Sequence, residues 1–345
     1  METLRMKKIS TIFIKIYYKM QQLKSNLKRK DYTKTVLELM NYMNCDKCIE
    51  NKMLLYDAIG NEIAILYELK SGYVIVDKST NEICEFSLTS RCKYFENKNN
   101  HYIYAGPLSY YEEKEEGICT ELTTNLVIPN TQVQEKIELA KVNYIKKKNT
   151  LRNKKSKNKK GMPYKEKKIG GIIPNISYNP NGVCGSCAVS NFLSYLYKNI
   201  NQKYISNNYI ENGQIKEEEL VKSIIPYIEG EESLNIEIES EGSDENRLLE
   251  GLEKYLYDNN IEEKFKKSYL TVLKGRGIIN KGFPFIMGLY SALGNPYGNH
   301  WVVAISYLYK LSSFMAMYYG IIDGWGSNDV YINVAWSDVT VWIEF

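Results

Sequence analysis

The sequence predicts an α+β protein, and three observations lead to that fold class. The C-terminal half has helix-compatible segments first and short β-type segments last. The N-terminal half contains four short apolar segments separated by turn residues, as in antiparallel strands joined by tight turns. The chain has 345 residues, 44% hydrophobic and 25% charged, which allows two globular domains and excludes a disordered or fibrous chain.

Residues 1–144 are expected to form a small α+β domain. Its first 50 residues are polar, and apolar residues recur at helical spacing between Val36 and Met43. The β-type segments that follow are Met53–Tyr56, Ile63–Tyr67, Tyr73–Val76 and Ile83–Phe86. A helix is expected from about Gln132 to Tyr144.

Residues 145–168 are expected to form a basic linker. Between Lys146 and Lys168 there are 12 Lys and Arg against one acid, a net charge of +11, which leaves −7 for the rest of a chain that carries +4. The overall pI therefore does not indicate nucleic-acid binding, and the segment lacks the interleaved aromatics of a nucleic-acid interface. An exposed segment of this kind is also where proteolytic cleavage concentrates.

Residues 169–345 are expected to form the second domain. A helix from about Gly185 to Ile200 comes first, with a buried stripe of Val189, Phe192, Leu193, Leu196 and Ile200. Acidic helical segments extend to about Asn280. The expected strands are Phe283–Leu289, His300–Tyr309, Phe314–Asp323, Val330–Val334 and Val339–Phe345.

Targeting signals and cysteines leave the compartment open. No run of about 18 apolar residues occurs, so no membrane-spanning helix is expected. The apolar run Ile9–Ile14 behind Lys7 and Lys8 is shorter than the roughly 7–15 residues of a signal peptide. Seven cysteines, none after Cys187, make a poor disulfide framework. They fit a reducing compartment, or a secreted protein with one reactive thiol.

One local motif carries chemistry. The turn-rich loop 179–183 leads directly into a helix that begins with Cys184-Gly185-Ser186-Cys187. A cysteine in the first turn of a helix faces free backbone N–H groups and the positive end of the helix dipole, which stabilise a thiolate. Cys184 and Cys187 are therefore candidate nucleophiles. The alternative is that either is an inert core residue.

Two further residues complete a catalytic set. The chain has only two histidines, His101 and His300, and His300 begins an apolar strand, where a base could reach into a cleft. Asp323 ends the next expected strand, and antiparallel pairing can bring it close to His300. A carboxylate there would orient the imidazole. An aspartate before Gly324 can instead cap its own turn.

This ordered set resembles the papain-like cysteine peptidases, in particular the streptopain-like and bacteriocin-processing (C39-like) bacterial branches. The residues that carry the resemblance are Cys184-Gly185-Ser186-Cys187-Ala188, Asn299-His300-Trp301 and Asp323-Gly324-Trp325-Gly326. The resemblance covers residues 169–345 and implies a helix packed on a C-terminal antiparallel sheet. It also implies a thiol protease that cleaves protein or peptide substrates through a thioester, without a metal or organic cofactor. Asp323 stands where papain has asparagine.

The resemblance leaves the nucleophile open. Plant-type enzymes use the second cysteine of this motif, which corresponds to Cys187. The bacterial branches use a cysteine followed by Gly-x-x-Ala, which corresponds to Cys184 and is favoured because position 188 is alanine. The family's oxyanion glutamine falls on Tyr178 or Asn181, and Asn181 is the better amide donor.

The N-terminal half resembles the pro-domain of streptopain-like enzymes through Ile63–Leu69, Gly72–Asp77 and Glu82–Phe86. This second resemblance implies a zymogen. The N-terminal domain would act as inhibitor, and the basic linker would be the site of cleavage. The family is usually exported, so an extracellular location is expected from the resemblance and a cytoplasmic one otherwise.

Other functions remain open from the sequence. Cys184 and Cys187 form a thioredoxin-like motif, but no strand-like run precedes it as that fold requires. Zinc binding by Cys45, Cys48, Cys184 and Cys187 would need two pairs from different expected domains. A transglutaminase or amidase uses the same Cys-His-Asp set, and a non-catalytic binding protein could share the scaffold.

Overall fold

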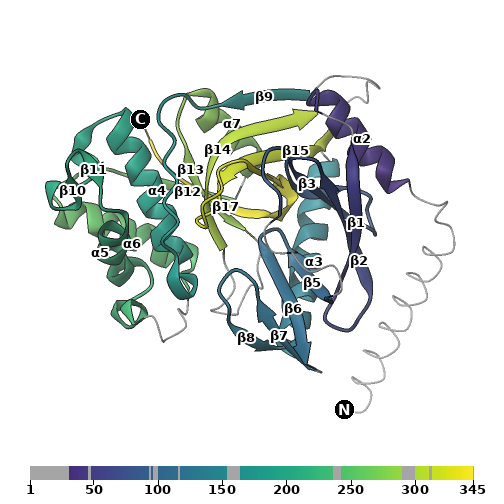
Figure 1. Cartoon of the computed structure of the whole chain (residues 1–345). Helices are drawn as coiled ribbons and strands as arrows, with labels where there is room; N and C mark the ends of the chain where they lie inside the picture. The colour runs from purple at the N-terminus through teal and green to yellow at the C-terminus, as the bar shows by residue number, and fades with distance from the viewer. Residues whose placement is uncertain are drawn as a thin grey trace, which may run out of the picture.

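A computed structural model describes residues 31–45, 48–92, 95, 100–115, 117–153, 164–235, 242–269, 271–289, 300–310 and 313–344. Within these residues the fold is α+β, as the sequence predicts, with six α-helices and one large, mostly antiparallel sheet (Figure 1). The expectations for residues 1–30, Asn299 and Phe345 lie outside this part of the chain. No helix among the described residues has both the length and the apolar character to cross a membrane.

The helices and strands have the following bounds. The helices are α2 (Tyr32–Tyr42), α3 (Asn130–Asn153), α4 (Cys184–Asn199), α5 (Glu217–Ile228), α6 (Glu245–Asp258) and α7 (Thr271–Asn280). The strands of the N-terminal part are β1 (Ile49–Tyr56), β2 (Glu62–Leu69), β3 (Tyr73–Asp77), β4 (Ile83–Ser87), β5 (Tyr102–Gly106), β6 (Ser109–Glu115), β7 (Ile118–Glu121) and β8 (Val127–Pro129). The remaining strands are β9 (Tyr164–Lys168), β10 (Ile210–Glu211), β11 (Gln214–Ile215), β12 (Phe265–Ser268), β13 (Phe285–Leu289), β14 (His300–Lys310), β15 (Ser313–Ile322), β16 (Val330–Asn333) and β17 (Ser337–Ile343).

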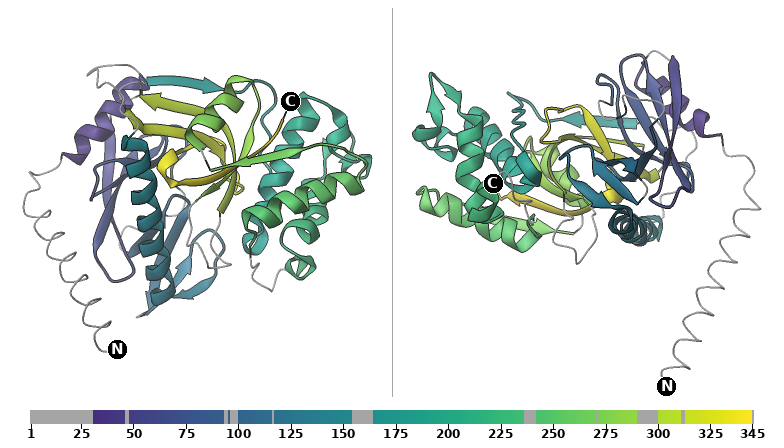
Figure 2. Two further views of the ribbon diagram at one scale, coloured as in Figure 1. Left: turned by 180° about the vertical axis from the view of Figure 1, so that it is seen from behind. Right: turned by 60° about the horizontal axis from the view of Figure 1, so that its bottom comes forward.

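A single sheet joins the two halves of the chain. Its strand order is β12-β17-β13-β14-β15-β16-β4-β3-β2-β1-β5-β6-β7-β8, and β9 pairs with β14. The junction is antiparallel pairing of β16 with β4, in which Tyr331 lies opposite Phe86 and Ile332 opposite Glu85. We call this junction the seam, residues 31–153 the N-terminal unit and residues 164–344 the C-terminal unit. Figure 2 shows the strands of both units side by side.

Helices cover different parts of the sheet. Helices α4, α5 and α6 pack against one another at one end of the molecule, and α4 also contacts β13 and β14 (Figure 1). Helix α3 lies across the other end, in contact with β5, β8 and β15 (Figure 2). Helix α4 of the C-terminal unit therefore packs on an antiparallel sheet, as expected.

Helix α4 is buried along most of its length. The expected stripe is correct for Val189, Phe192, Leu193 and Leu196, which are all buried. It is wrong for Ile200, which is 46% exposed because the helix ends at Asn199 and the chain turns away. Burial on nearly all sides explains why the first turn of α4 can hold groups away from water.

The expected linker is structured at both described ends. Helix α3 continues past Tyr144 to Asn153, because Lys and Arg are good helix formers. Residues Tyr164–Lys168 form β9, whose backbone pairs with the edge of β14 while four of its side chains stay exposed. Over these residues the expected linker is therefore helix and paired strand, and most side chains of β9 are exposed as expected.

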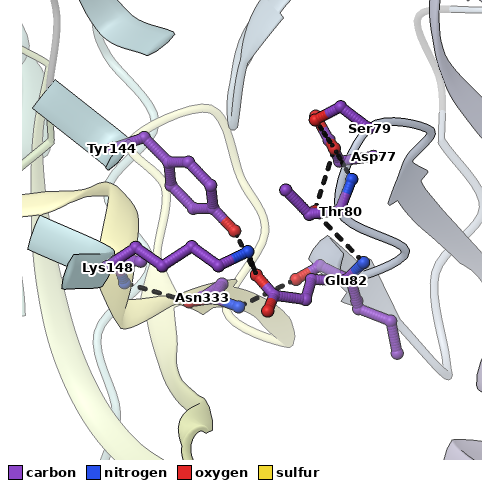
Figure 3. Close-up of polar contacts among 9 residues, drawn as sticks. Asp77, Ser79, Thr80, Glu82, Tyr144, Lys148 and Asn333 are labelled. Carbon is purple, nitrogen blue, oxygen red and sulfur yellow. Dashed lines mark hydrogen bonds and ion pairs between the residues drawn. The ribbon is translucent and has the colours of Figure 1, made fainter. Parts of the chain in front are cut away.

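A polar network holds α3 against the N-terminal strands (Figure 3). Glu82, in the turn between β3 and β4, accepts hydrogen bonds from the Tyr144 hydroxyl and, at 2.8 Å, from the Lys148 ammonium group. The Tyr144 ring also stacks on Trp336 of the C-terminal unit, with centroids 4.8 Å apart. Nearby, the Asn333 amide donates to the Ile83 carbonyl at 3.0 Å. These contacts connect the two units beside the seam.

Candidate active site

The candidate site is built on the first turn of α4. The chain enters it through a short 3-10 helix, Pro180–Gly182, and Gly182 adopts a φ of +83°, which favours glycine. Val183 is the N-cap residue and its side chain makes no capping hydrogen bond. The backbone N–H groups at the start of α4 are therefore available to groups from other parts of the chain.

Cys184 lies at this helix start and is 6% exposed. Its sulfur is within hydrogen-bonding reach of the backbone N–H groups of Cys184 itself, Gly185 and Trp301. Because Trp301 directly follows His300, the contact puts the thiol beside the start of β14. Burial, with a smaller contribution from the charge of Glu229, raises the pKa of Cys184 to about 12. The thiol is therefore protonated in this form of the protein.

His300 is the first residue of β14. Its ring stacks on the indole of Trp325, with centroids 4.2 Å apart and the planes inclined by 11°. The imidazole forms a hydrogen bond with the backbone of Asp323, and Nε2 has no hydrogen-bond partner among the described residues. Burial lowers the pKa of His300 to about 3, so the ring is neutral.

Asp323 follows β15 directly and is buried. Its Oδ1 accepts the backbone N–H groups of Trp325 at 2.8 Å and Ser327 at 2.9 Å. The carboxylate therefore shapes the loop that carries Trp325, which is the turn-capping alternative considered from the sequence. The contact to His300 runs through the Asp323 backbone. Asp323 thus acts on the imidazole through its main chain and through the position of Trp325.

Cys187, the alternative nucleophile, is fully buried one turn further along α4. Its thiol lies 3.5 Å from the Ile176 carbonyl oxygen and 3.7 Å from that of Gly324. Burial raises the pKa of Cys187, and the charges of Cys184 and Asp323 add to the effect. Carbonyl acceptors favour the protonated thiol, so Cys187 is packed as a core residue.

The amide of Asn179 lies beside the loop that follows Asp323. Asn181 lies within the 3-10 helix Pro180–Gly182. Asn179 lies before that helix, and neither atom of its buried amide has a hydrogen-bond partner among the described residues. A Cβ built on Gly324 would lie 3.5 Å from the Asn179 nitrogen, so this amide faces the loop that follows Asp323. The sequence count from Cys184 passed over Asn179 because it lies one residue from the expected position.

A buried glutamate, which the sequence analysis did not identify, completes the site. Glu229 follows α5 and is 0% exposed. Its carboxylate accepts the Ser186 backbone N–H at 3.0 Å and the Ser186 hydroxyl. Burial raises the pKa of Glu229 to about 7. Nothing near Glu229 in the sequence indicates this contact, because the residues that meet are 43 positions apart.

The remaining candidates lie elsewhere. The other histidine, His101, pairs with Glu113 at 2.8 Å in the N-terminal unit. Cys45, Cys48, Cys184 and Cys187 form no disulfide, and no group of three or more His, Cys, Asp or Glu within the described ranges could hold a metal ion. Among the expected site residues, the structure shows Cys184 in contact with the Trp301 backbone, and His300 in contact with the Asp323 backbone.

The sequence was compared with protein-family models and with curated proteins. No protein-family model matches this chain, and no curated protein is similar enough in sequence to count as a match.

Proposed function

We propose that this chain is a cysteine peptidase with Cys184 as nucleophile and His300 as proton carrier. The observation that carries the proposal is the contact of the Cys184 sulfur with the backbone N–H of Trp301. This contact supports the proposal because it links a thiol at a helix N-terminus to the residue that directly follows His300 in β14. Stacking of that histidine on Trp325 fixes the plane of the imidazole, which a proton carrier requires.

The proposed reaction is acyl transfer to water. His300 takes the Cys184 proton as the sulfur attacks the peptide carbonyl carbon. The C–N bond then breaks, the imidazolium protonates the leaving amine, and a thioester remains. His300 next removes a proton from water, the resulting hydroxide attacks the thioester, and the C–S bond breaks. The imidazolium finally returns a proton to the sulfur, so the enzyme ends in its starting state.

Asn179 is proposed as the amide donor to the oxyanion, together with the Cys184 backbone N–H. Its unpaired, buried Nδ2 group supports this role, because a buried donor without a partner is costly unless a ligand uses it. Asn181, the amide expected from the sequence, is the alternative donor. Asp323 is proposed to hold Trp325 in the position in which it stacks on the His300 ring, rather than to take up a proton.

The neutral states of Cys184 and His300 suit a resting form. Burial disfavours both the Cys184 thiolate and the His300 imidazolium. The N-terminal unit reaches this region, because the charge of Asp323 contributes to the raised pKa of Glu85 in β4. We propose that the N-terminal unit holds the enzyme as a zymogen. Cleavage in the basic sequence between Asn153 and Tyr164 would relax the site.

The test is hydrolysis of a protein substrate such as casein by the full chain, before limited trypsin cleavage and after it, once the trypsin has been blocked with a serine-peptidase inhibitor. Cys184→Ala and His300→Ala are each expected to lower activity by roughly a thousandfold or more. The matched variant Cys187→Ala, one turn along the same helix, should keep activity within about tenfold if it folds. Full activity in Cys184→Ala, or inactivity of the folded wild type before and after cleavage, would contradict the proposal.

A further inference from the structure

Glu229 forms hydrogen bonds with the first turn of α4. It follows the end of α5, is fully buried, and directs both carboxylate oxygens at the first turn of α4. One oxygen accepts the Ser186 backbone N–H at 3.0 Å and the other accepts the Ser186 hydroxyl. Since the N-cap Val183 has no capping side chain, Glu229 supplies the missing cap from another helix.

The carboxylate lies tightly against the helix. A Cβ built on Gly185 would be 2.7 Å from the Glu229 Oε1 atom and 2.6 Å from the Ser243 hydroxyl oxygen. Any other residue at position 185 would therefore push the carboxylate away. Gly185 is the neighbour of Cys184, and its N–H group is within reach of both Glu229 and the Cys184 sulfur.

Two acidic groups thus share one helix N-terminus. The backbone N–H groups and the helix dipole there stabilise a negative charge, but negative charges on Glu229 and Cys184 would repel each other in this poorly solvated site. When Glu229 is ionised, its charge adds to the effect of burial and disfavours the Cys184 thiolate further. When Glu229 is protonated, that added effect is absent.

The other charged groups around Glu229 do not remove this competition. Arg247 of α6 is the cation beside it, and its Nη2 atom donates at 2.5 Å to the Glu229 backbone carbonyl rather than to the carboxylate. Arg247 also faces Glu232, 3.9 Å away in the segment after α5. The acidic groups of α4 that face Glu229 are the thiols of Cys184 and Cys187.

We propose that Glu229 is a positioning residue for Cys184, which fixes the first turn of α4 and by its charge shifts to higher pH the range in which Cys184 becomes a thiolate. The inference deepens the proposed function, on which it rests for the role of the thiolate. Burial raises the pKa of Glu229 to about 7, so its charge appears as the pH rises through neutrality. The repulsion between the Glu229 charge and the Cys184 thiolate is therefore weak below about pH 6 and fully developed above about pH 8.

The experiment measures the rate at which iodoacetamide labels Cys184 in the full chain, resolved by peptide mass spectrometry. Glu229→Gln keeps the shape, and its amide can still accept the Ser186 N–H. At about pH 8 we expect Cys184 to react roughly tenfold faster in Glu229→Gln than in the wild type, which corresponds to about one pKa unit. At about pH 5, where wild-type Glu229 is protonated too, the two rates should converge.

The controls lie in the same chain. Glu232→Gln makes the same charge change at an exposed position three residues away, and should alter the Cys184 rate by less than about twofold. The exposed Cys48 is an internal reference whose rate should not change in any variant. If Glu229→Gln does not fold, Ser186→Ala takes its place. It removes one donor to the carboxylate and should raise the Cys184 rate at neutral pH in the same direction.

Two results would overturn the inference. Equal rates in the wild type and Glu229→Gln at about pH 8 would mean that the charge does not act on Cys184. Equally increased rates at both pH values would mean that the variant merely loosens the helix. Peptide hydrolysis is not used in this test, so a chain in which Cys184→Ala keeps full activity would disprove the proposed function and leave the labelling result standing.

Discussion

Two fully buried glutamates in different parts of the molecule are held in different ways. Glu229 faces the start of α4, where a helix presents several N–H groups in one direction. Glu85 lies in β4 at the seam, where it accepts the Leu108 backbone N–H at 3.0 Å and the Tyr110 hydroxyl at 2.5 Å. Both carboxyl groups have lost all contact with water, but only Glu229 is surrounded by a helix terminus.

The difference appears in the acidity of the two groups. Burial raises the pKa of Glu229 to about 7 and that of Glu85 to about 8. Near Glu229 the charge of Arg247 lowers the pKa, whereas near Glu85 the charge of Asp323 raises it further. Equal burial therefore does not give equal acidity. The carboxyl at the helix start can change its charge near neutral pH, and the one at the seam stays protonated there.

The largest effect that follows is on pH-dependent stability, through Glu85→Gln. In the folded wild type Glu85 keeps its proton up to about pH 8, while in the unfolded chain it loses it above its ordinary value of 4.5. The wild type should therefore lose stability as the pH rises between these limits. Relative to the wild type, Glu85→Gln should gain on the order of 4 kcal/mol between about pH 4 and about pH 9.

Urea denaturation across this pH range measures the gain. The matched comparison is Glu229→Gln, whose relative gain should be smaller and complete about one pH unit earlier. A wild type and Glu85→Gln with parallel stability curves would show that Glu85 is ionised inside the folded seam. That outcome would remove the contrast between the two carboxyl groups.

A smaller effect is expected from Lys148→Met, which removes the cation of the network that holds α3. The Lys148 side chain is 7% exposed, and that of its partner Glu82 is 22% exposed. Glu82 would keep the hydrogen bond from Tyr144 and some contact with water, so the loss should be about 2 kcal/mol rather than the 3–5 of a fully buried pair. The measurement is the free energy of unfolding in urea at neutral pH.

Lys146→Met is the control for this variant, because Lys146 lies on the same helix with an exposed side chain. It should change the unfolding free energy by less than about 0.5 kcal/mol. Equal losses in both variants would mean that helix propensity or net charge, and not the buried pair, is responsible. The network in Figure 3 would then not hold α3 in place.

The sequence was sufficient where a local pattern decides the structure. The buried stripe from Val189 to Leu196 and the β-type run after His300 predict α4 and β14 to within one residue at their ends. The motif at Cys184 also predicts a thiol at a helix start. These inferences depend on neighbours within a few turns or strand residues, so no long-range information was needed.

The same sequence could not reveal the seam or the position of Glu229. Pairing of Phe86 with Tyr331 joins strands from opposite ends of the chain, and no periodicity records which edges will meet. The contact of Glu229 with Ser186 depends on how α5 packs beside α4. Each of these is decided by packing between elements rather than within one.

The smallest effects come from removing one hydroxyl donor from each glutamate. Ser186→Ala leaves Glu229 with the backbone N–H groups of Ser186 and Gly185, whereas Tyr110→Phe leaves Glu85 with the Leu108 N–H alone. Each lost bond to a carboxylate should cost about 1 kcal/mol when the glutamate is ionised and less when it is protonated.

Because each hydroxyl lowers the pKa of its glutamate, both variants should raise that pKa further and lose more stability above about pH 8 than below about pH 5. The shift should be larger for Tyr110→Phe, since Glu85 has fewer donors left to share a negative charge. Urea denaturation at the two pH values measures both differences. A larger shift in Ser186→Ala would mean that the helix N–H groups contribute little to Glu229. The Ser186 hydroxyl would then be its main support, and the helix start would no longer explain the lower pKa of Glu229.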